Sequence, residues 1–250
     1  MTLSVSEFDI PQGIDLSNKV ILVTGAGDGI GKTASLTFAS LGATVILLGR
    51  TVSKLEAVYD DIIALGAPQP AIIPLDLEGA SKSHYQQMAV TIEEQFGRLD
   101  GLLHNASLLG ELRPFEQIEE AEFNQIMQVN LNSAFLMTQA LIPVLKKAAH
   151  ASVVFTSSSV GVKGRAYWGT YAISKFATEG MMQTLADEFG NTSLRFNCIN
   201  PGGTRTSMRA KAFPAEDPEN LKTPKDIMPL YTFLMSEKSE QLNGKTIKAQ

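Results

Sequence analysis

Tyr171 and Lys175 are a pair whose residue types and spacing could do acid–base chemistry. They stand four positions apart in "YAISK", and residues at that spacing share one face of a helix. A phenol with an ordinary pKa of about 10 is a poor base at neutral pH, but a nearby ammonium group stabilises the phenolate and lowers that pKa. The pair could therefore exchange a proton with a reacting oxygen. A solvated helix face would show the same spacing, so this interpretation needs support elsewhere in the chain.

Ser158 and Asn130 are polar residues in places where a site could use them. Ser158 lies near the end of the apolar run "ASVVFTSSS", and ligands bind at the carboxyl ends of the strands in an open α/β sheet. A hydroxyl there could hold a substrate oxygen and stabilise charge that develops on it. Asn130 lies inside a predicted helix, where asparagine is unfavourable. The alternatives are a serine that only ends its strand and a buried structural asparagine.

The segment "VTGAGDGIGKTA" allows two interpretations, and both hold phosphate at a helix N-terminus. From Ala26 onward it is close to a P-loop, which implies phosphoryl transfer. From Thr24 onward, Gly25, Gly29 and Gly31 form a turn that holds the pyrophosphate of a dinucleotide, which implies hydride transfer. A P-loop enzyme also needs a carboxylate for Mg²⁺, and Asp76 is a weak candidate for it.

The dinucleotide interpretation predicts a residue that reads the adenosine ribose at the end of the second strand. That place is "LLGRT", where Gly49 replaces the carboxylate of an NAD enzyme and Arg50 follows. A guanidinium group binds a 2′-phosphate, so the sequence favours NADP(H). Asp28 would oppose a phosphate nearby, which leaves NAD(H) possible. A solvated arginine at a helix start is the alternative.

The elements that must position these residues alternate between short apolar runs and longer helical stretches. The runs are apolar at nearly every position, as in a parallel sheet covered on both faces, and repeated βα units indicate a doubly wound α/β fold with a mostly parallel sheet. We predict strands over 19–24, 43–49, 71–76, 99–105, 151–159, 193–200 and 244–249. We predict helices over 29–41, 52–65, 81–96, 120–147 (kinked at Pro143), 167–189 and 224–235.

Composition limits the class of protein. The 250 residues are 44% hydrophobic, which predicts one domain with a large core over 1–250 and argues against disorder. We expect an N-terminal arm over 1–17 and, in the polar segment 209–223, a lid over the substrate. A net charge of −5 gives no support to nucleic-acid binding. Without a signal peptide or an apolar stretch of about 18 residues, we expect a cytoplasmic protein that does not enter membranes. Cys198 is expected to be a buried, inert thiol, and no metal site is expected.

In combination, these residues resemble the short-chain dehydrogenase/reductase family over nearly the whole chain, from about Asn18 to Ala249. Within the family the chain looks most like an uncharacterised bacterial oxidoreductase branch. The order and spacing of the matches are specific, although each piece alone is weak. The matches are Thr24-Gly25-(x)3-Gly29-Ile30-Gly31, Asp76, Asn105-Ala106, Asn130, Ser158, Tyr171-(x)3-Lys175 and Pro201-Gly202.

The resemblance implies a Rossmann fold and hydride transfer between NADP(H) and a carbonyl or alcohol. It makes Tyr171 the general acid for reduction and the base for oxidation, with Ser158 holding the substrate oxygen. Lys175 lowers the Tyr171 pKa and contacts the nicotinamide ribose, and Asn130 holds a water that relays protons towards Lys175. The cofactor-binding residues that it implies are Gly25, Gly29, Ile30, Gly31, Arg50, Asp76, Leu77, Asn105, Tyr171, Lys175, Thr204 and Thr206.

The resemblance leaves the substrate open. Ser107 stands where the family usually has glycine, beside the expected ribose. The expected wall of the substrate pocket is mainly apolar, with no clustered Lys or Arg, which favours an uncharged or weakly polar carbonyl compound; it comprises Val160, Tyr167, Trp168, Gly203 and Met208. In this family the helices around 130–147 and 167–189 pair across a two-fold axis, so we expect a homodimer or homotetramer. Its contacts would include Phe176, Met181, Met182 and Leu185. A non-catalytic NADP-binding regulator on the same fold is the alternative function.

Overall fold

The computed structural model describes residues 2–250, and in it eight strands form one sheet. The strands are β1 (Thr2–Ser4), β2 (Val20–Thr24), β3 (Thr44–Gly49), β4 (Ala71–Pro74), β5 (Gly101–His104), β6 (Ala151–Thr156), β7 (Leu194–Asn200) and β8 (Lys245–Lys248). Their order across the sheet is β1-β8-β7-β6-β5-β2-β3-β4. Every pairing between neighbours is parallel.

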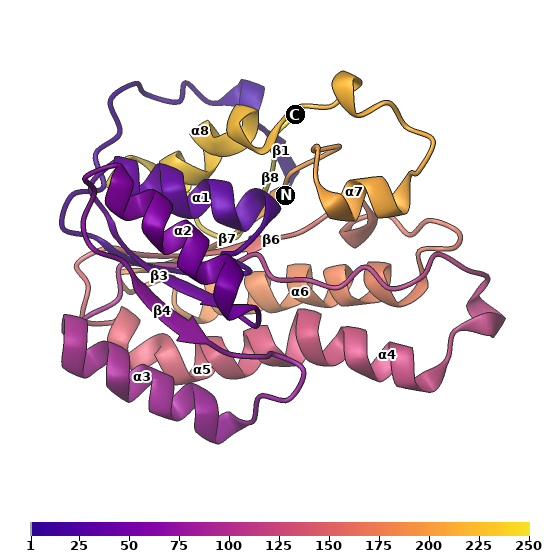
Figure 1. The fold of residues 1–250 in the computed structure, drawn as a ribbon, viewed down its shortest axis with the longest axis horizontal. Coiled ribbons are helices and arrows are strands. Elements are labelled where there is room, and N and C mark those ends of the chain that lie inside the picture. Colours follow the sequence, from indigo (N-terminus) through magenta and orange to yellow (C-terminus); the bar gives the residue numbers. More distant parts are fainter. Residues whose placement is uncertain (1) are drawn as a thin grey trace.

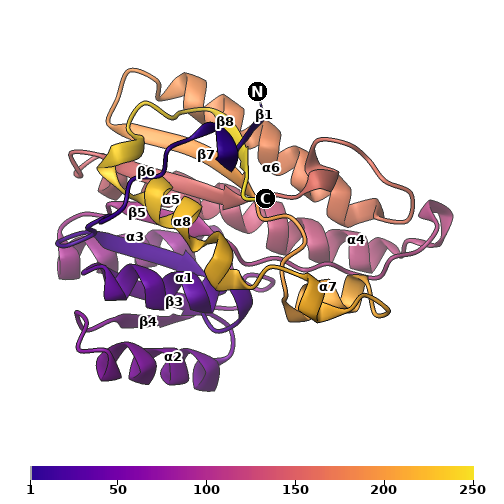
Figure 2. The ribbon, with the colours of Figure 1, turned by 90° about the horizontal axis from the view of Figure 1, so that it is seen from above.

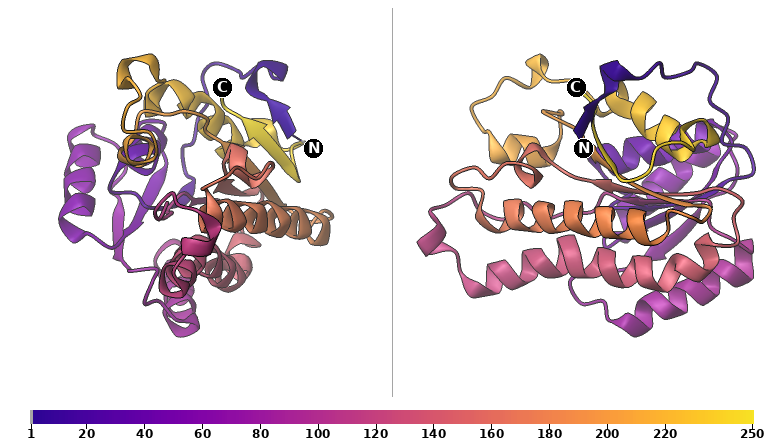
Figure 3. Two further views of the ribbon diagram at one scale, coloured as in Figure 1. Left: turned by 90° about the vertical axis from the view of Figure 1, so that its right-hand side faces the viewer. Right: turned by 180° about the vertical axis from the view of Figure 1, so that it is seen from behind.

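Helices cover both faces of this sheet, as Figures 1 and 3 show. One face carries α1 (Gly29–Ser40), α2 (Val52–Ala64) and α8 (Pro224–Met235). The other carries α3 (Lys82–Phe96), α4 (Glu120–Met127), α5 (Ser133–Leu145) and α6 (Gly169–Glu188). The predicted doubly wound α/β fold is confirmed.

Strand β2 shows why the strands are apolar at nearly every position. Val20 and Leu22 belong to the hydrophobic cluster under one set of helices, and Ile21 and Val23 belong to the cluster under the other set. Successive side chains of a strand point to opposite faces, so a strand in the middle of three layers must be apolar on both. The two clusters fix the sheet between the helices, and the sheet in turn places the carboxyl ends of β2, β3, β6 and β7 along one edge.

The N-terminal arm contains a strand that the sequence analysis missed. Thr2–Ser4 pairs with β8, with Thr2 opposite Thr246, at the edge of the sheet (Figure 3). A strand of three residues, each polar or half-buried, is too short to show an apolar pattern in the sequence. Its partner strand lies at the opposite end of the chain. The register therefore depends on contacts that local sequence does not encode.

The long helix predicted over 120–147 is two helices joined by one π-helical turn, Gln128–Asn132. Helix α5 passes through Pro143 and ends at Leu145, and the interruption of the α-helical hydrogen-bond pattern lies at Gln128–Asn132. Single π turns in α-helices are frequent at functional sites. The turn brings Asn130 into the interior, where it is buried.

The segment after β7 lies at the carboxyl edge of the sheet (Figure 2). It forms α7 (Ser207–Ala212) and a short 3-10 turn at Pro218–Asn220. A bidentate ion pair joins Arg209 on α7 to Glu216, with N–O distances of 2.6 and 2.5 Å. The predicted segment 209–223 thus contains short helical turns and folds back on itself. No helix within residues 2–250 has the length and apolar character needed to cross a bilayer.

Candidate active site

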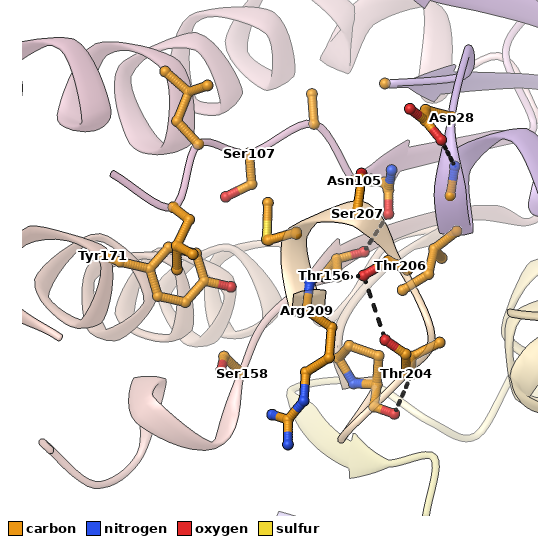
Figure 4. Close-up of a pocket in the computed structure, with 18 of the residues that line it drawn as sticks. Asp28, Asn105, Ser107, Thr156, Ser158, Tyr171, Thr204, Thr206, Ser207 and Arg209 are labelled. Atoms are coloured by element: carbon orange, nitrogen blue, oxygen red, sulfur yellow. Dashed lines mark hydrogen bonds between the residues drawn. The ribbon is translucent and has the colours of Figure 1, made fainter. Parts of the chain in front are cut away.

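A large cavity opens at the carboxyl ends of the strands, and part of it is drawn in Figure 4. All but two of the predicted catalytic and cofactor-binding residues line it, although they come from segments spread over most of the chain. The lining residues among them are Gly25, Gly29, Ile30, Arg50, Asp76, Leu77, Asn105, Ser158, Tyr171, Lys175, Thr204 and Thr206. The two exceptions, Gly31 and Asn130, lie just behind the cavity wall.

The glycine turn between β2 and α1 has backbone geometry that side chains would prevent. Gly25 has a φ of 67°, in the left-handed region that favours glycine. A Cβ on Gly31 would lie 2.1 Å from the carbonyl oxygen of Gly25 and 2.7 Å from Nδ2 of Asn105. Gly31 therefore contacts the turn itself and not the cavity. Its missing side chain lets α1 begin directly against the turn, with its N-terminus facing the cavity, where a helix can hold phosphate.

Asp28 caps α1 and is also paired with a lysine that the sequence analysis missed. Its Oδ1 accepts a 2.7 Å hydrogen bond from the Gly29 amide, and its Oδ2 accepts one of 2.7 Å from Lys54 Nζ. The bond from Lys54 holds the pKa of Asp28 below its usual value. Lys54, three residues after the N-cap of α2, lines the cavity beside Arg50. The negative charge that would oppose a nearby phosphate is therefore compensated.

The wall of the cavity beside the glycine turn is held together by hydrogen bonds to Thr24. The amides of Asn105 and Ala106 both donate to Thr24 Oγ1 at 3.0 Å, which ties the end of β5 to the end of β2. Asn105 Nδ2 donates to the Thr24 carbonyl at 3.3 Å. Asp76 is exposed, and its Oδ1 accepts from the Glu78 amide at 3.2 Å. The carboxylate of Asp76 keeps acceptor capacity for a ligand.

Thr204 and Thr206 line the cavity from the segment that leads from β7 to α7 (Figure 4). Thr204 Oγ1 donates to the Pro201 carbonyl at 3.0 Å, and Thr206 Oγ1 donates to the Thr204 carbonyl at 3.4 Å. Thr206 is also the N-cap of α7, accepting from the Arg209 amide at 3.2 Å. Both hydroxyls thus shape the loop while they line the cavity.

Tyr171 and Lys175 come from α6, and Ser158, just after β6, faces Tyr171 (Figure 4). Tyr171 is 8% exposed and Lys175 is 4% exposed. Lys175 Nζ donates to the Thr156 carbonyl at 2.8 Å and lies 5.4 Å from the centroid of the Tyr171 ring. A buried ammonium group thus stands behind a buried phenol whose hydroxyl points into the cleft.

The pKa values differ from the sequence-based expectation that Lys175 lowers the pKa of Tyr171. Burial raises the pKa of Tyr171 to about 12, and the nearby Ser158 hydroxyl opposes this only in part. Burial lowers the pKa of Lys175 to about 8, with Cys198 and Glu179 opposing it. At neutral pH Tyr171 therefore holds its proton, as an acid must, and most of Lys175 is charged.

Asn130 forms hydrogen bonds that connect the loop after β5 with α6. Its Oδ1 accepts from the Leu108 amide at 2.7 Å, and its Nδ2 donates to the Leu108 carbonyl at 2.9 Å and to Ser174 Oγ at 3.0 Å. It also borders a small second cavity together with Lys175, Thr156 and His104. Burial lowers the pKa of His104 to about 3, so this imidazole is uncharged. The side chain of Asn130 thus holds the loop after β5 against α6.

The far end of the cavity is walled as predicted by Val160, Trp168, Gly203 and Met208. Tyr167 is 62% exposed and does not line it. The walls contain two basic residues, Arg165 and Arg209, although no clustered Lys or Arg was expected there. Arg165 lies in a loop and Arg209 on the short helix α7, and the sequence does not give the course of either segment.

Phe213 packs against residues from both sides of the far end of the cavity. Its ring centroid lies 5.8 Å from that of Trp168. The Arg209 guanidinium lies 3.8 Å from the Phe213 ring centroid, and Arg165 lies 5.5 Å from it. The segment after α7 therefore packs over the cleft against its far wall.

Ser107 has a polar atom without a partner. Its Oγ is buried and makes no hydrogen bond with the described residues, and Ser107 lines the same cavity as Tyr171 (Figure 4). Residues 2–250 contain no cluster of three or more His, Cys, Asp or Glu side chains that could hold a metal ion. Cys198 is buried as predicted.

Comparison with known proteins agrees with this geometry. The family model for short chain dehydrogenases matches residues 19–217. The chain is 55% identical over 235 residues to the uncharacterized oxidoreductase YciK of Escherichia coli K12, covering 94% of this chain and 93% of that protein.

Two similar crystal structures were determined with a bound dinucleotide. A protein of Shigella flexneri 2a strain 301, described as a short chain dehydrogenase and complexed with NADP, is 53% identical, with a TM-score of 0.93 over 96% of this chain and 100% of that one. A short chain dehydrogenase of Escherichia coli CFT073 complexed with NADPH is 54% identical, with a TM-score of 0.93 and the same coverage. Because the family model covers well over half of the chain and the sequence and fold of these relatives match along nearly its whole length, the chain belongs to the short-chain dehydrogenase family.

Proposed function

We propose that this protein is an NADP(H)-dependent oxidoreductase that transfers hydride between the cofactor and a carbonyl or alcohol substrate. The observation that carries the proposal is the convergence of Tyr171, Lys175 and Ser158 at one end of a cavity whose other end is the glycine turn. The two relatives complexed with NADP and NADPH support the choice of cofactor.

The residues present fit a dinucleotide. Gly25, Gly29 and Ile30 would hold the pyrophosphate at the N-terminus of α1, where the absence of side chains gives the backbone room. Asp76, Leu77 and Asn105 would contact the adenosine side, and Thr204 and Thr206 the nicotinamide side. Arg50, which pairs with no acidic side chain among residues 2–250, would bind the 2′-phosphate. The bound cofactor supplies the hydride.

The chain's own residues manage the proton and the orientation. In reduction, Tyr171 donates its phenolic proton to the carbonyl oxygen as that oxygen gains charge. The Ser158 hydroxyl donates a hydrogen bond to the same oxygen and fixes its place. The Lys175 ammonium lies next to the phenolate that forms and stabilises it. Asn130 would position the backbone next to a water that restores the proton through Lys175.

A panel of ketones and aldehydes with NADPH tests this function and separates it from the alternative. Turnover of any member, measured by NADPH absorbance, supports the oxidoreductase. Enhanced NADPH fluorescence without turnover on the whole panel would support a non-catalytic NADP-binding regulator. A cytoplasmic location, a single catalytic domain over 1–250 and movement of 209–223 as a lid stay predictions.

We expect Arg50 to give a preference for NADPH over NADH. A charge-assisted contact to the 2′-phosphate is worth roughly 1.5–3 kcal/mol, or about one to two decades in affinity. The double variant Gly49→Asp/Arg50→Ala should lose NADPH affinity and gain NADH affinity, measured by fluorescence titration of both cofactors. The Cβ of the new aspartate would lie 3.2 Å from a methyl group of Leu55 and would disturb the packing there. Arg50→Ala alone leaves Gly49 in place and is therefore the control for this change in packing. Equal binding of NADH and NADPH by wild type would contradict the assignment.

We also expect the chain to form a homodimer or homotetramer through α5 and α6. Ile173 and Phe176 are exposed on α6 and Phe135 on α5, and exposed apolar side chains on adjoining helices suit a subunit contact. Met182, expected in that contact, is instead 0% exposed in the core. Met181 and Leu185 are half-buried and pack against the core. Light scattering at micromolar concentration should show a multiple of 27.0 kDa, and a particle of that mass alone would exclude the assembly.

A further inference from the structure

Glu179 is a buried carboxylate to which the proposed chemistry gives no role. It lies on α6, four residues after Lys175, and is 4% exposed. Ser157 Oγ donates to its Oε1 at 2.5 Å, and Thr246 Oγ1 donates to its Oε2. An ionised carboxylate only accepts hydrogen bonds, so two hydroxyls donating to its two oxygens suit the ionised form. Burial of such a charge is costly unless an opposite charge compensates it.

The sheet beneath α6 supplies no such opposite charge. Ser157 follows β6, Thr246 belongs to β8, and Cys198 on β7 lies close to Glu179. Burial and the negative charge of Glu179 raise the pKa of the Cys198 thiol well above its usual value, with Lys175 opposing this. The thiol is therefore uncharged at neutral pH. The positive group that remains beside Glu179 in the described residues is Lys175.

The groups around Lys175 also leave Glu179 as the partner of its charge. Tyr171 lies in front of it, Tyr231 on α8 lies behind Thr156, and His104 lies across the small second cavity. Burial raises the pKa of both tyrosines and lowers that of His104. All three are therefore uncharged near pH 7. Cys198 and Glu179 are the two groups that act on the charge of Lys175. Because the thiol is uncharged, the carboxylate of Glu179 is the one that can compensate the ammonium charge.

The packing leaves this pair little room to separate. Gly161, in the turn after Ser158, fits only because it lacks a side chain. A Cβ there would lie 2.9 Å from Ser157 Oγ and 3.0 Å from Lys175 Cβ. The turn that carries Ser158 thus rests on both the hydroxyl that holds Glu179 and the stem of Lys175.

We propose that Glu179 is a positioning residue of the active site, whose carboxylate is the buried counter-charge that keeps the Lys175 ammonium protonated. Lys175 Nζ donates to the Thr156 carbonyl, and no oxygen of Glu179 lies within 4.0 Å of it. The coupling therefore acts through space in a poorly solvated interior, where charges interact more strongly than in water. Its importance for turnover rests on the proposed function, but the coupling itself needs neither cofactor nor substrate.

The test is a pH titration of Lys175 by NMR, with ¹³C at the lysine ε-carbons and the Lys175 signal assigned by its loss in Lys175→Met. We expect a wild-type midpoint near the pKa of about 8. Glu179→Gln keeps the shape and can still bond both hydroxyls, but it removes the charge. It should lower the Lys175 midpoint by about one pH unit or more. On any substrate that the enzyme reduces, the alkaline limb of kcat/KM should move to lower pH in the same variant.

Glu188→Gln is the matched control, because Glu188 is an exposed carboxylate on the same helix. Glu188→Gln should leave the Lys175 midpoint unchanged. If Glu179 had only a structural role, Glu179→Gln would also leave that midpoint unchanged. Glu179→Met removes the charge with different packing and serves if the glutamine variant does not fold. An unshifted midpoint in either folded Glu179 variant would overturn the proposal. So would a wild-type midpoint below about pH 7, the range of buried lysines without a counter-charge.

The outcomes also separate this inference from the proposed function. A shifted midpoint in a protein that reduces nothing on the carbonyl panel would leave the charge coupling intact and count against the oxidoreductase. An unshifted midpoint in an enzyme that reduces a member of the panel would overturn the charge coupling and leave the oxidoreductase function supported.

Discussion

Tyr171→Phe should abolish turnover and leave NADPH binding intact. Phenylalanine keeps the buried ring that packs against Trp168 and Ala172, but it has no proton to give. General acid catalysis is typically worth 10²–10⁴ in rate, so kcat on a reduced substrate should fall by at least about a hundredfold. The dissociation constant for NADPH, measured by fluorescence, should stay within about twofold, since a twofold change is only about 0.4 kcal/mol.

Tyr167→Phe is the control for this prediction. Tyr167 is four residues earlier and lines no part of the cavity, so its variant should keep wild-type turnover. Retention of more than about a tenth of wild-type kcat by Tyr171→Phe would show that another group supplies the proton, because the loss would lie below the usual range for general acid catalysis.

The pH dependence follows from the direction of the Tyr171 shift. Because burial raises its pKa to about 12, Tyr171 carries its proton across the physiological range. In the oxidative direction of the proposed reaction the phenolate must form. The Ser158 hydroxyl opposes the effect of burial on the Tyr171 pKa, and in the proposed mechanism the charge of Lys175 would stabilise the phenolate.

The parts of the fold that the sequence predicted are those that depend on local pattern. The helix with Tyr171 and Lys175, the glycine turn and the apolar strands each follow from short-range rules, and the order of the βα units implies one carboxyl edge. That is why residues as distant as Gly25 and Thr206 could be expected at one cavity. Their roles stay predictions, whereas their placement around that cavity is observed.

What the sequence did not predict depends on contacts between distant segments. The pairing of Thr2–Ser4 with β8 joins the two ends of the chain. The bond from Lys54 to Asp28 joins α2 to the glycine turn and compensates the Asp28 charge that the sequence analysis expected to oppose a phosphate. Burial reversed the expected direction of the Tyr171 pKa shift, and burial is a property of the packed interior and not of a four-residue spacing.

Lys175→Met should lose turnover and also weaken NADPH binding, in contrast to Tyr171→Phe. Methionine has a similar length and keeps the buried stem packed, but it removes the charge next to Tyr171 and the donor to the Thr156 carbonyl. Turnover should fall by at least about a hundredfold, because the phenolate loses its stabilising charge. NADPH affinity should fall by about tenfold or more, the worth of a hydrogen bond from a charged group at roughly 1.5–3 kcal/mol.

The pH dependence of NADPH binding gives this variant a signature of its own. In wild type, Lys175 is charged below its pKa of about 8 and uncharged above it, so NADPH affinity should weaken as the pH rises through that value. Lys175→Met has no charge to lose and should show a flat profile there, while Tyr171→Phe should keep the wild-type profile. If Lys175→Met instead bound NADPH as tightly as wild type at pH 7, Lys175 would act on the tyrosine alone, and the second role assigned to it in holding the cofactor would be wrong.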